Sequence, residues 1–436
     1  MQISKSIKLS YMLFKYLIQN IYYNQGGKGM NNFINVTSEI GKLNKVMLHR
    51  PGNEVENLVP DYLERLLFDD IPYLKVAQEE HDRFAEVLRE NGTEVLYLED
   101  LAAEVLEDKK IKDEFLNQFL KESHIDNVDV YETLYQDLVG RSTKDMVNTL
   151  MAGVRKETIQ IKTSRSLREL MEDKYPFYLD PMPNLYFTRD PAAAAGNGLI
   201  INRMKRAARR RETLFMRYIH KYHKNFKTPE IPLWYDRGFD FYIEGGDELI
   251  LSDKIIAIGC SERTSPEAIE VVAKNLFDNS NFEKVLVFEI PSRRAFMHLD
   301  TVFTMVDYDK FTIHPGIEGP LNVFEITRGQ NDGLNIIHDK NTVDNILKNA
   351  LNLPAVDLIR CGNGDEIVAA REQWNDGSNT LAIAPGRVIT YERNYVTNEI
   401  LSKRGIDVLT IPSAELSRGR GGPRCMSMPL NRDNLV

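Results

Sequence analysis

Short segments rich in β-branched residues recur from Leu43 to the C-terminus, and this recurrence limits the possible fold more than any other feature of the sequence. Several of these segments are followed by a stretch with the i, i+3, i+4 apolar spacing of a helix. Strands that alternate with helices are typical of an α/β fold. The expected strands lie within residues 45–53, 93–98, 198–204, 248–260, 284–290, 301–316, 379–393 and 406–413.

Two of the strand–helix segments, residues 256–272 and 388–404, are loosely alike. In each, a strand is followed by Glu-Arg and then by a helix with an early glutamate. A strand–helix unit that repeats around a ring would give this pattern. A plain α/β sandwich is the alternative, and the weak repeat alone does not decide between the two.

A block of about eighty residues, 101–179, has almost no strand signal. Apolar residues recur there with helical spacing in segments 100–123, 130–140, 143–154 and 164–175. We therefore expect a helical bundle inserted into the α/β fold. The expected division is a first α/β part at 30–100, an inserted α-helical domain at 101–179, and the remainder of the α/β domain at 180–436.

The first 29 residues differ from the rest of the chain. Their apolar and aromatic run is interrupted by Lys15, and the glycine-rich stretch 24–30 separates it from the first strand. A membrane span needs roughly twenty apolar residues, and a secretory signal needs an uninterrupted apolar core. We expect residues 1–29 to be an extension outside the fold, with an interfacial helix as the alternative.

Composition narrows the classes of function. The formal net charge of −9 argues against a nucleic-acid-binding protein, which normally presents a basic face. Only three cysteines occur, Cys260, Cys361 and Cys425, and none belongs to a CxxC pair. A disulfide scaffold and a structural zinc site are therefore not expected. These features favour a cytoplasmic protein that acts on a small molecule.

The stretch 419–430, GRGGPRCMSMPL, places Cys425 after a cationic, glycine-rich run. A thiol near its ordinary pKa of about 8.5 is mostly protonated at neutral pH, so a nucleophilic cysteine needs activation. Nearby cations lower a thiol pKa, and Arg418, Arg420 and Arg424 are candidates for that effect. The alternative is a buried structural thiol, which is our interpretation of Cys260 and Cys361.

Among the eight histidines, His298 stands out because it lies between apolar residues and is followed at i+2 by Asp300. On a strand these two side chains would point to the same face. A buried aspartate is costly unless it is paired, so the pair calls for a cationic partner. The histidines interpreted as surface residues are His81, His220 and His223, and His338 is expected in a loop.

Two further acidic stretches resemble this one. In PNLYFTRDP a strand-like run ends at Asp190, before Pro191, and in FYIEGGDELIL Glu244 and Asp247 flank a Gly-Gly turn. Each is weak evidence by itself, but with His298, Asp300 and Cys425 they form a set of one nucleophile, one histidine and several acids. Carboxylates around a thiol raise its pKa unless a cation joins them. That cation can be the substrate.

At these residues the sequence resembles the arginine deiminase family. The motifs PNLYFTRDP, IEGGD, MHLDTVFTM and RGGPRCMSMPL occur in the order and at roughly the spacing found in that family. The resemblance runs from about Met30 to the C-terminus. Arg211 stands where we expect glutamine, at a position that we expect to face away from the chemistry.

The resemblance implies the guanidino-modifying, or pentein, fold: a five-bladed α/β propeller with an inserted helical bundle. It also implies hydrolysis of L-arginine to L-citrulline and ammonia through a covalent intermediate on Cys425. The implied catalytic set adds His298 as the proton-transfer group, Asp190 and Asp300 as holders of the guanidinium, and Glu244 to orient His298. No metal or organic cofactor is implied, because each step is addition, elimination or proton transfer.

The resemblance further implies a set of residues that contact the rest of the substrate: Leu67, Asn184, Phe187, Arg209, Asp247, Arg263, Arg420 and Gly421. The expected partner is L-arginine, with no nucleic acid and no membrane, in a homo-oligomer of two or four subunits. Two alternatives stay open. One is another guanidino-group enzyme, such as an agmatine deiminase or an amidinotransferase. The other is a binding protein without activity on the same fold.

Overall fold

The computed structural model describes residues 33–159, 175–227, 230–291, 296–317 and 321–435. The expected extension at 1–29 lies outside these ranges, as does nearly all of the helix expected at 164–175. Within them, no helix is long and apolar enough to cross a membrane.

Five of the sheets in the described residues share one strand pattern. In each, a first strand pairs antiparallel with a second, which pairs parallel with a third. The five sets, in that order, are β5 (Ala192–Ala195), β6 (Gly198–Ile201) and β7 (Leu233–Tyr235); β8 (Glu248–Ile250), β9 (Ile255–Cys260) and β10 (Lys284–Glu289); β11 (Phe303–Met305), β12 (Lys310–Ile313) and β15 (Asp357–Arg360); β16 (Leu381–Ala384), β17 (Arg387–Tyr391) and β18 (Asp407–Ile411); and β19 (Met428–Arg432), β1 (Leu43–Leu48) and β2 (Glu94–Tyr97).

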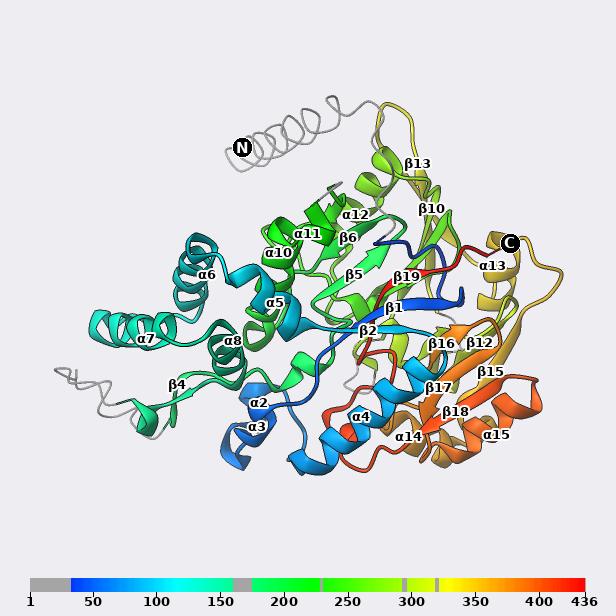
Figure 1. The fold of residues 1–436 in the computed structure, drawn as a ribbon. Helices are drawn as coiled ribbons and strands as arrows, with labels where there is room; N and C mark the ends of the chain where they lie inside the picture. The colour runs from blue at the N-terminus through cyan, green and yellow to red at the C-terminus, as the bar shows by residue number, and fades with distance from the viewer. Residues whose placement is uncertain (1–32, 160–174, 228–229, 292–295, 318–320, 436) are drawn as a thin grey trace.

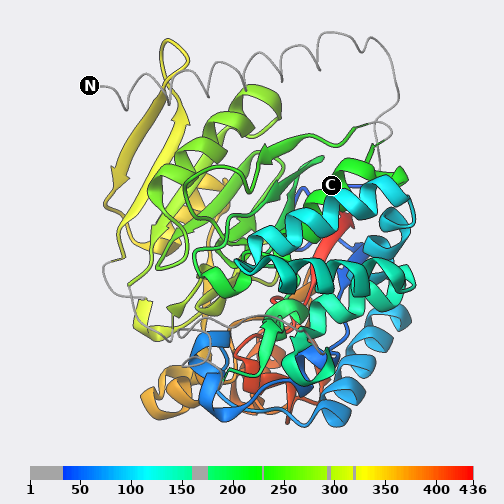
Figure 2. The ribbon, with the colours of Figure 1, turned by 90° about the vertical axis from the view of Figure 1, so that its left-hand side faces the viewer.

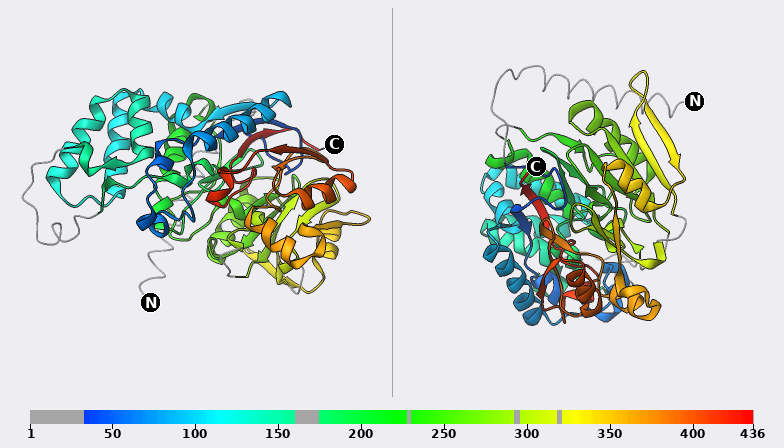
Figure 3. Two further views of the ribbon diagram at one scale, coloured as in Figure 1. Left: turned by 90° about the horizontal axis from the view of Figure 1, so that it is seen from below. Right: turned by 90° about the vertical axis from the view of Figure 1, so that its right-hand side faces the viewer.

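Two further pairs complete the strands. The hairpin of β13 (Val323–Arg328) and β14 (Leu334–Asp339) extends the second sheet beyond β10 and stands at the periphery of the molecule (Figure 3). A short ribbon joins β3 (Val154–Arg155) to β4 (Phe177–Leu179).

Each second strand reaches its parallel third strand through a connection that contains a helix, because parallel strands cannot be joined by a tight turn. These connecting helices are α4 (Leu74–Glu90), α10 (Glu212–Tyr222), α12 (Pro266–Asn279), α13 (Val343–Ala350) and α15 (Tyr395–Lys403). Helix α12 begins with proline at its first position and is capped by the Ser265 side chain, which accepts from the Ala268 N–H. Further helices are α2 (Asn53–Glu56), α3 (Leu63–Leu66), α11 (Lys224–Lys227) and α14 (Glu366–Trp374).

The two ends of the described chain meet in one sheet. β1 pairs with β19 along the register from Leu43 opposite Arg432 to Met47 opposite Met428. The blue and red strands therefore run side by side at the centre of Figure 1. Because the pair is antiparallel, the start of β19, which follows shortly after Cys425, lies beside the end of β1 at Met47.

Four helices, α5 (Leu98–Leu106), α6 (Lys109–Glu122), α7 (Val128–Gly140) and α8 (Thr143–Ala152), form a group at one side of the sheets. The group lies on the left in Figure 1 and faces the viewer in Figure 2. Asp108, Asn127 and Ser142 cap α6, α7 and α8, so each helix begins where its sequence supplies an acceptor. Phe115 packs on Phe215 of α10, with the ring centroids 5.3 Å apart. The helical group thus shares a hydrophobic core with the neighbouring sheet.

Four interpretations of histidines were wrong. His81, His220 and His223 were expected at the surface, but all three are buried. They lie on or just after amphipathic helices and on the side that faces the core; His220 Nε2, for example, lies 2.8 Å from the Ile231 carbonyl oxygen. His338, expected in a loop, lies on β14 and stacks on Phe324.

Candidate active site

A cavity of about 340 Å³ lies where the segments carrying the candidate residues converge. It is lined by nine of the thirteen residues that the sequence singled out: Leu67, Asn184, Phe187, Asp190, Arg209, Arg263, His298, Arg420 and Cys425. The other four, Glu244, Asp247, Asp300 and Gly421, do not line it and lie behind its wall.

The convergence has a simple topological origin. In each of the five sheets, the segment that leads into the first strand carries a group of the site. Asp190 precedes β5, Glu244 and Asp247 precede β8, and His298 and Asp300 precede β11. Asn379 precedes β16, and Arg424 and Cys425 precede β19. Residues scattered over more than two hundred positions therefore occupy equivalent places in the fold.

Cys425 lies in a turn and is almost completely buried. Its Sγ is 3.6 Å from Oδ2 of Asp300, and its N–H donates to Oδ1 of Asn379 at 3.0 Å. Burial and the negative charges of Asp300, Asp190 and Asp376 raise the pKa of the thiol well above its ordinary value. The thiol is therefore protonated at neutral pH in this structure.

The expectation that flanking arginines lower this pKa was wrong. Arg418 pairs with Asp70 and Glu415 near the surface. The Arg420 guanidinium lies over the ring of Trp374, 3.6 Å from its centroid. These arginines are adjacent in sequence to the cysteine, but their side chains are directed at other groups.

Asp190 and Asp300 each keep one oxygen without a hydrogen-bond partner within the described ranges. Oδ2 of Asp190 accepts from Nη1 of Arg209 at 2.6 Å, and Oδ2 of Asp300 accepts from Nη1 of Arg424 at 2.8 Å. The Oδ1 atoms of both aspartates are buried and have no hydrogen-bond partner among the described residues. Buried acceptors of this kind are costly, so the pair is suited to a cationic ligand with several N–H donors.

His298 is held between two carboxylates. Its Nε2 is 2.9 Å from Oε2 of Glu244, and its Nδ1 is 3.8 Å from Oδ1 of Asp190. Although burial disfavours the imidazolium, the negative charges of Asp190, Glu244 and Asp247 raise the pKa of His298 to about 9. The histidine therefore carries a proton at neutral pH.

The backbone at His298 differs from the expected strand. His298 is the N-cap of the 3₁₀ helix η7 (Leu299–Thr301), so Asp300 lies in a helical turn. The strand argument for a shared face was wrong. Both side chains still belong to the site, because Asp300 reaches Arg424 and Cys425 while His298 reaches Glu244.

Glu244 is the N-cap of the 3₁₀ helix η5 (Gly245–Asp247) and Asp247 is its last residue; Glu244 contacts His298, and Asp247 contacts the next residue, Leu299. Nη1 of Arg263 donates to Oε2 of Glu244 at 3.1 Å. Burial opposes ionisation, but Arg263 and His298 lower the pKa of Glu244 to about 2. Asp247 accepts from the Leu299 N–H at 2.8 Å, so it fixes the turn that carries His298 instead of lining the cavity.

Arg209 is buried, although it lies in a basic run of which most members were expected in solvent. It pairs with Asp190 and with both oxygens of Glu212. Gly421 is needed for close packing, because a Cβ there would lie 2.2 Å from the ring of Phe187. Phe187, Asn184 and Leu67 form the less charged wall of the cavity.

Sequence reasoning missed four groups around the site: Glu39, Glu212, Asp376 and Asn379. Asp376 and Asn379 lie in the turn before a first strand, as the other acids do, so the recurring position was the available signal. Burial raises the pKa of Asp376 to about 7. Glu39 is 385 residues away from Arg424, and the sequence carries no signal for their contact.

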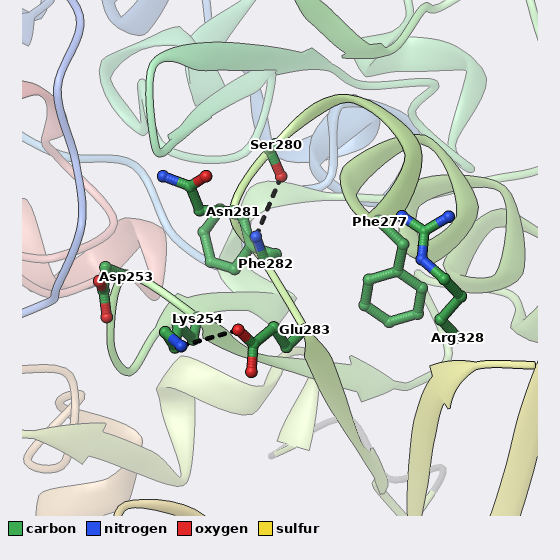
Figure 4. Close-up of a pocket in the computed structure, with 8 residues that line it drawn as sticks. All are labelled: Asp253, Lys254, Phe277, Ser280, Asn281, Phe282, Glu283 and Arg328. Atoms are coloured by element: carbon green, nitrogen blue, oxygen red, sulfur yellow. Dashed lines mark hydrogen bonds and ion pairs between the residues drawn. The ribbon is translucent and has the colours of Figure 1, made fainter.

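A second cavity, of about 440 Å³, lies beside α12 and β10 (Figure 4). Three of its four charged side chains pair: Nζ of Lys254 is 2.7 Å from Oε1 of Glu283, and Arg328 pairs with Asp278. No cysteine or histidine lines it. Across the described ranges, no three His, Cys, Asp or Glu side chains are arranged to hold a metal ion. The smaller cavity at Cys425 is therefore the candidate active site.

Comparison with known proteins finds relatives that match nearly the whole chain. The family model for arginine deiminase matches residues 64–432. The arginine deiminase of Bacillus cereus (strain ATCC 10987 / NRS 248) is 58% identical over 410 residues, which cover 93% of this chain and 100% of that protein. The arginine deiminase of Latilactobacillus sakei is 56% identical over 407 residues, which cover 92% and 99%.

Solved structures share the fold at low sequence identity. The amidinotransferase SxtG from Microseira wollei superposes with a TM-score of 0.54 at 16% identity, covering 93% of this chain and 98% of that one. The N-terminal domain of ArgZ, a cyanobacterial arginine dihydrolase, gives 0.50 at 13% identity, covering 90% and 99%. The fold is therefore an α/β fold of the same kind. The family model and the relatives, which match nearly the whole length, show that this chain belongs to the arginine deiminase family.

Proposed function

We propose that this chain is an arginine deiminase that hydrolyses L-arginine to L-citrulline and ammonia through a covalent intermediate on Cys425, in arginine catabolism. The observation that carries the mechanism is that the buried Oδ1 atoms of Asp190 and Asp300, beside a buried thiol, have no hydrogen-bond partner in the part of the chain that the structure describes. High identity to arginine deiminases over nearly the whole chain supports the reaction.

The substrate guanidinium is planar, cationic and rich in N–H donors. Asp190 and Asp300 would hold it by charge-assisted hydrogen bonds, with its central carbon beside the Cys425 sulfur. A bound cation offsets the carboxylate charges that raise the thiol pKa. Substrate binding would thus lower the thiol pKa, so that Cys425 releases its proton to water and the thiolate forms only when the electrophile is in place.

In the first half-reaction, the Cys425 thiolate attacks the guanidinium carbon and a C–S bond forms. The tetrahedral adduct collapses as a C–N bond breaks. His298, which carries a proton at neutral pH, donates that proton to the departing nitrogen, and ammonia leaves. An amidino thioether remains on Cys425.

In the second half-reaction, the neutral His298 takes a proton from water, and the resulting hydroxide adds to the amidino carbon. The new tetrahedral adduct collapses, the C–S bond breaks and the Cys425 thiolate departs. The oxygen from water loses its remaining proton to solvent and becomes the ureido oxygen of citrulline. Glu244 would keep the His298 ring oriented through both steps, because its Oε2 holds Nε2.

The α-carboxylate of arginine would allow the site to distinguish arginine from guanidino compounds that lack a carboxylate. Arg209, Arg263 and Arg420 line the cavity and can offset the charge of the α-carboxylate. Agmatine has no such carboxylate, so an agmatine deiminase would gain nothing from this concentration of arginine. Leu67, Asn184 and Phe187 would contact the rest of the substrate.

Several properties of the whole protein belong to the same proposal. The five sheets with one strand pattern support a closed, five-bladed α/β propeller into which the helical region 101–179 is inserted, with residues 1–29 as an extension. All three cysteines are unpaired, which supports a cytoplasmic location. We also propose a homo-oligomer that binds neither nucleic acid nor membrane.

The test is to incubate the purified protein with L-arginine and to measure citrulline and ammonia together. We expect the two products in equal amounts, and none from Cys425→Ser. Agmatine should be a much poorer substrate at equal concentration. Equal turnover of agmatine would favour another guanidino-group enzyme, and binding of arginine without any product would favour a binding protein.

A further inference from the structure

We propose that Arg424, anchored by Glu39, is a positioning residue that keeps the Asp300 carboxylate ionised and its Oδ1 directed toward the substrate guanidinium. The inference rests on the proposed function, because it takes Asp300 as a holder of that guanidinium. It adds two residues to the site, one from each end of the described chain.

Glu39 holds Arg424 with a two-point contact. Oε2 of Glu39 accepts from Nε of Arg424 at 3.0 Å, and Oε1 accepts from Nη2 at 3.2 Å. Oε1 also accepts from the Ile250 N–H of β8 at 3.0 Å. Both side chains are buried. Burial disfavours the charged form of Glu39, but Arg424 and other nearby arginines outweigh this effect and lower the pKa of Glu39 to about 2. The anchor is thus an ionised carboxylate.

The opposite edge of the Arg424 guanidinium reaches Asp300. Nη1 donates to Oδ2 of Asp300 at 2.8 Å, while Nη2 donates to the Glu248 carbonyl at 2.7 Å. One carboxylate oxygen is therefore occupied by Arg424, and the other is left for a ligand. The planar guanidinium meets Glu39 along one edge and Asp300 at another nitrogen, a two-edged contact that the single nitrogen of an ammonium group cannot reproduce.

The charges around Asp300 explain why it needs this cation. Arg424, Arg189 and His298 favour its ionised form, whereas Asp190 and Asp376 oppose it, as does an ionised Cys425. Burial is the largest influence and raises the pKa of Asp300 despite Arg424. Among these three cations, Arg424 is the one with a hydrogen bond to the carboxylate. Its loss would leave a buried carboxylate that takes up a proton.

The residues that hold Asp300 come from segments that are far apart in the chain and meet only in the folded protein. Glu39 precedes β1, Arg424 precedes β19, and these two strands pair with each other. Ile250 belongs to β8 and Asp300 precedes β11. The chain of contacts thus fixes the position of Asp300 relative to Cys425, the residue that follows Arg424.

The experiment compares Arg424→Met, Arg424→Lys and Glu39→Gln with the wild type, and uses Arg432→Met as a matched control. Arg432 is a buried arginine of the same cluster, but its Nη1 donates to the Gly41 carbonyl and not to a group of the cavity. Two pH profiles are measured for each protein: kcat/KM for arginine, and the rate at which iodoacetamide alkylates Cys425 without substrate.

In Arg424→Met, we expect the acidic limb of the kcat/KM profile to move to higher pH. We also expect KM at neutral pH to rise at least about tenfold, because a charged hydrogen bond to the substrate is lost. The alkylation profile should move to lower pH, because a protonated Asp300 no longer opposes the thiolate. Shifts in opposite directions are not produced by a general loss of structure. Arg432→Met should lower thermal stability without moving either profile.

Arg424→Lys and Glu39→Gln keep a cation near Asp300 but loosen its position. We expect both to raise KM without moving the acidic limb upward, and these two variants decide the question if Arg424→Met does not fold. Profiles of Arg424→Met that coincide with those of the wild type, or a wild-type KM in Arg424→Lys, would overturn the inference. A wild-type protein that forms no citrulline would overturn the proposed function instead.

Discussion

Oδ2 of Asp300 lies 3.6 Å from Sγ of Cys425, and both side chains are buried. A carboxylate at this distance opposes a thiolate, so the protein's own groups hold the nucleophile in the unreactive form. The same carboxylate suits a guanidinium, which would cancel the repulsion as it binds. The geometry therefore couples activation of the thiol to the presence of a cationic substrate.

The first prediction concerns the thiol of the unliganded protein. The rate of Cys425 alkylation by iodoacetamide should rise with pH and reach its midpoint above the ordinary thiol pKa of about 8.5, because burial and three carboxylates raise the pKa. Asp300→Asn should move the midpoint downward. Peptide mapping identifies the modified cysteine, and a midpoint below pH 7 in the wild type would exclude substrate-assisted activation.

The second prediction concerns the two aspartates. Asp190→Asn and Asp300→Asn should each raise KM and lower kcat, both by about tenfold or more, since a charged hydrogen bond contributes about 1.5–3 kcal/mol. Steady-state kinetics with arginine provides the measurement. The assignment of both as guanidinium holders fails if kcat falls while KM is unchanged in both variants.

Glu248→Gln is the control for these aspartates. Glu248 is a buried acid near Arg424, and burial raises its pKa to about 8, so it is largely protonated at neutral pH. Replacing this neutral acid by the neutral amide of glutamine should therefore change kcat and KM little.

The third prediction concerns His298. The charge of Glu244 helps to raise the pKa of His298 to about 9, so Glu244→Gln should lower that pKa. A general acid is lost when it deprotonates, and the alkaline limb of kcat/KM should move to lower pH. An alkaline limb that stays in place would show that it reports a group other than His298.

The fourth prediction concerns stability away from the cavity. His49 is buried between Glu54 and Glu99, at 3.1 and 2.8 Å. His49→Asn would leave these glutamates without their cation, and breaking a buried ion pair costs about 3–5 kcal/mol. Thermal unfolding measures the loss, and the exposed His338→Asn should change stability by no more than about 0.5 kcal/mol.

The His49 contribution should also depend on pH. Burial opposes its charge, but the two glutamates raise the pKa of His49 to about 10, above the value of about 6.5 in an unfolded chain. A raised pKa stabilises the fold fully below pH 6.5, and this stabilisation is lost as the pH rises through about 10. The stability gap between wild type and His49→Asn should therefore shrink across this interval. A gap that is constant with pH would contradict the assigned charge.

The sequence carried enough local information to predict the α/β strands and the short motifs around Asp190, Glu244, His298 and Cys425. Each of these residues lies in a turn just before a first strand, where turn residues and β-branched runs are recognisable together. The helix caps at Asp108, Asn127 and Ser142 are local in the same way.

Side-chain direction and long-range pairing could not be predicted. Three arginines near Cys425 suggested a lowered thiol pKa, but Arg424 is directed at Asp300 and Glu39, and the surrounding acids raise the pKa. The burial of His81 depends on the face of α4 that meets the core, which a charged helical stretch does not reveal. The contact between Glu39 and Arg424 depends on the pairing of the two chain ends.

The covalent intermediate is tested most directly by acid quenching the protein during turnover of arginine and mapping its cysteine peptides by mass spectrometry. We expect the Cys425 peptide to gain the mass of arginine less ammonia, with Cys260 and Cys361 unmodified and no adduct in Cys425→Ser. Citrulline formation under conditions that trap no adduct on Cys425, or sustained turnover by Cys425→Ser, would contradict the mechanism.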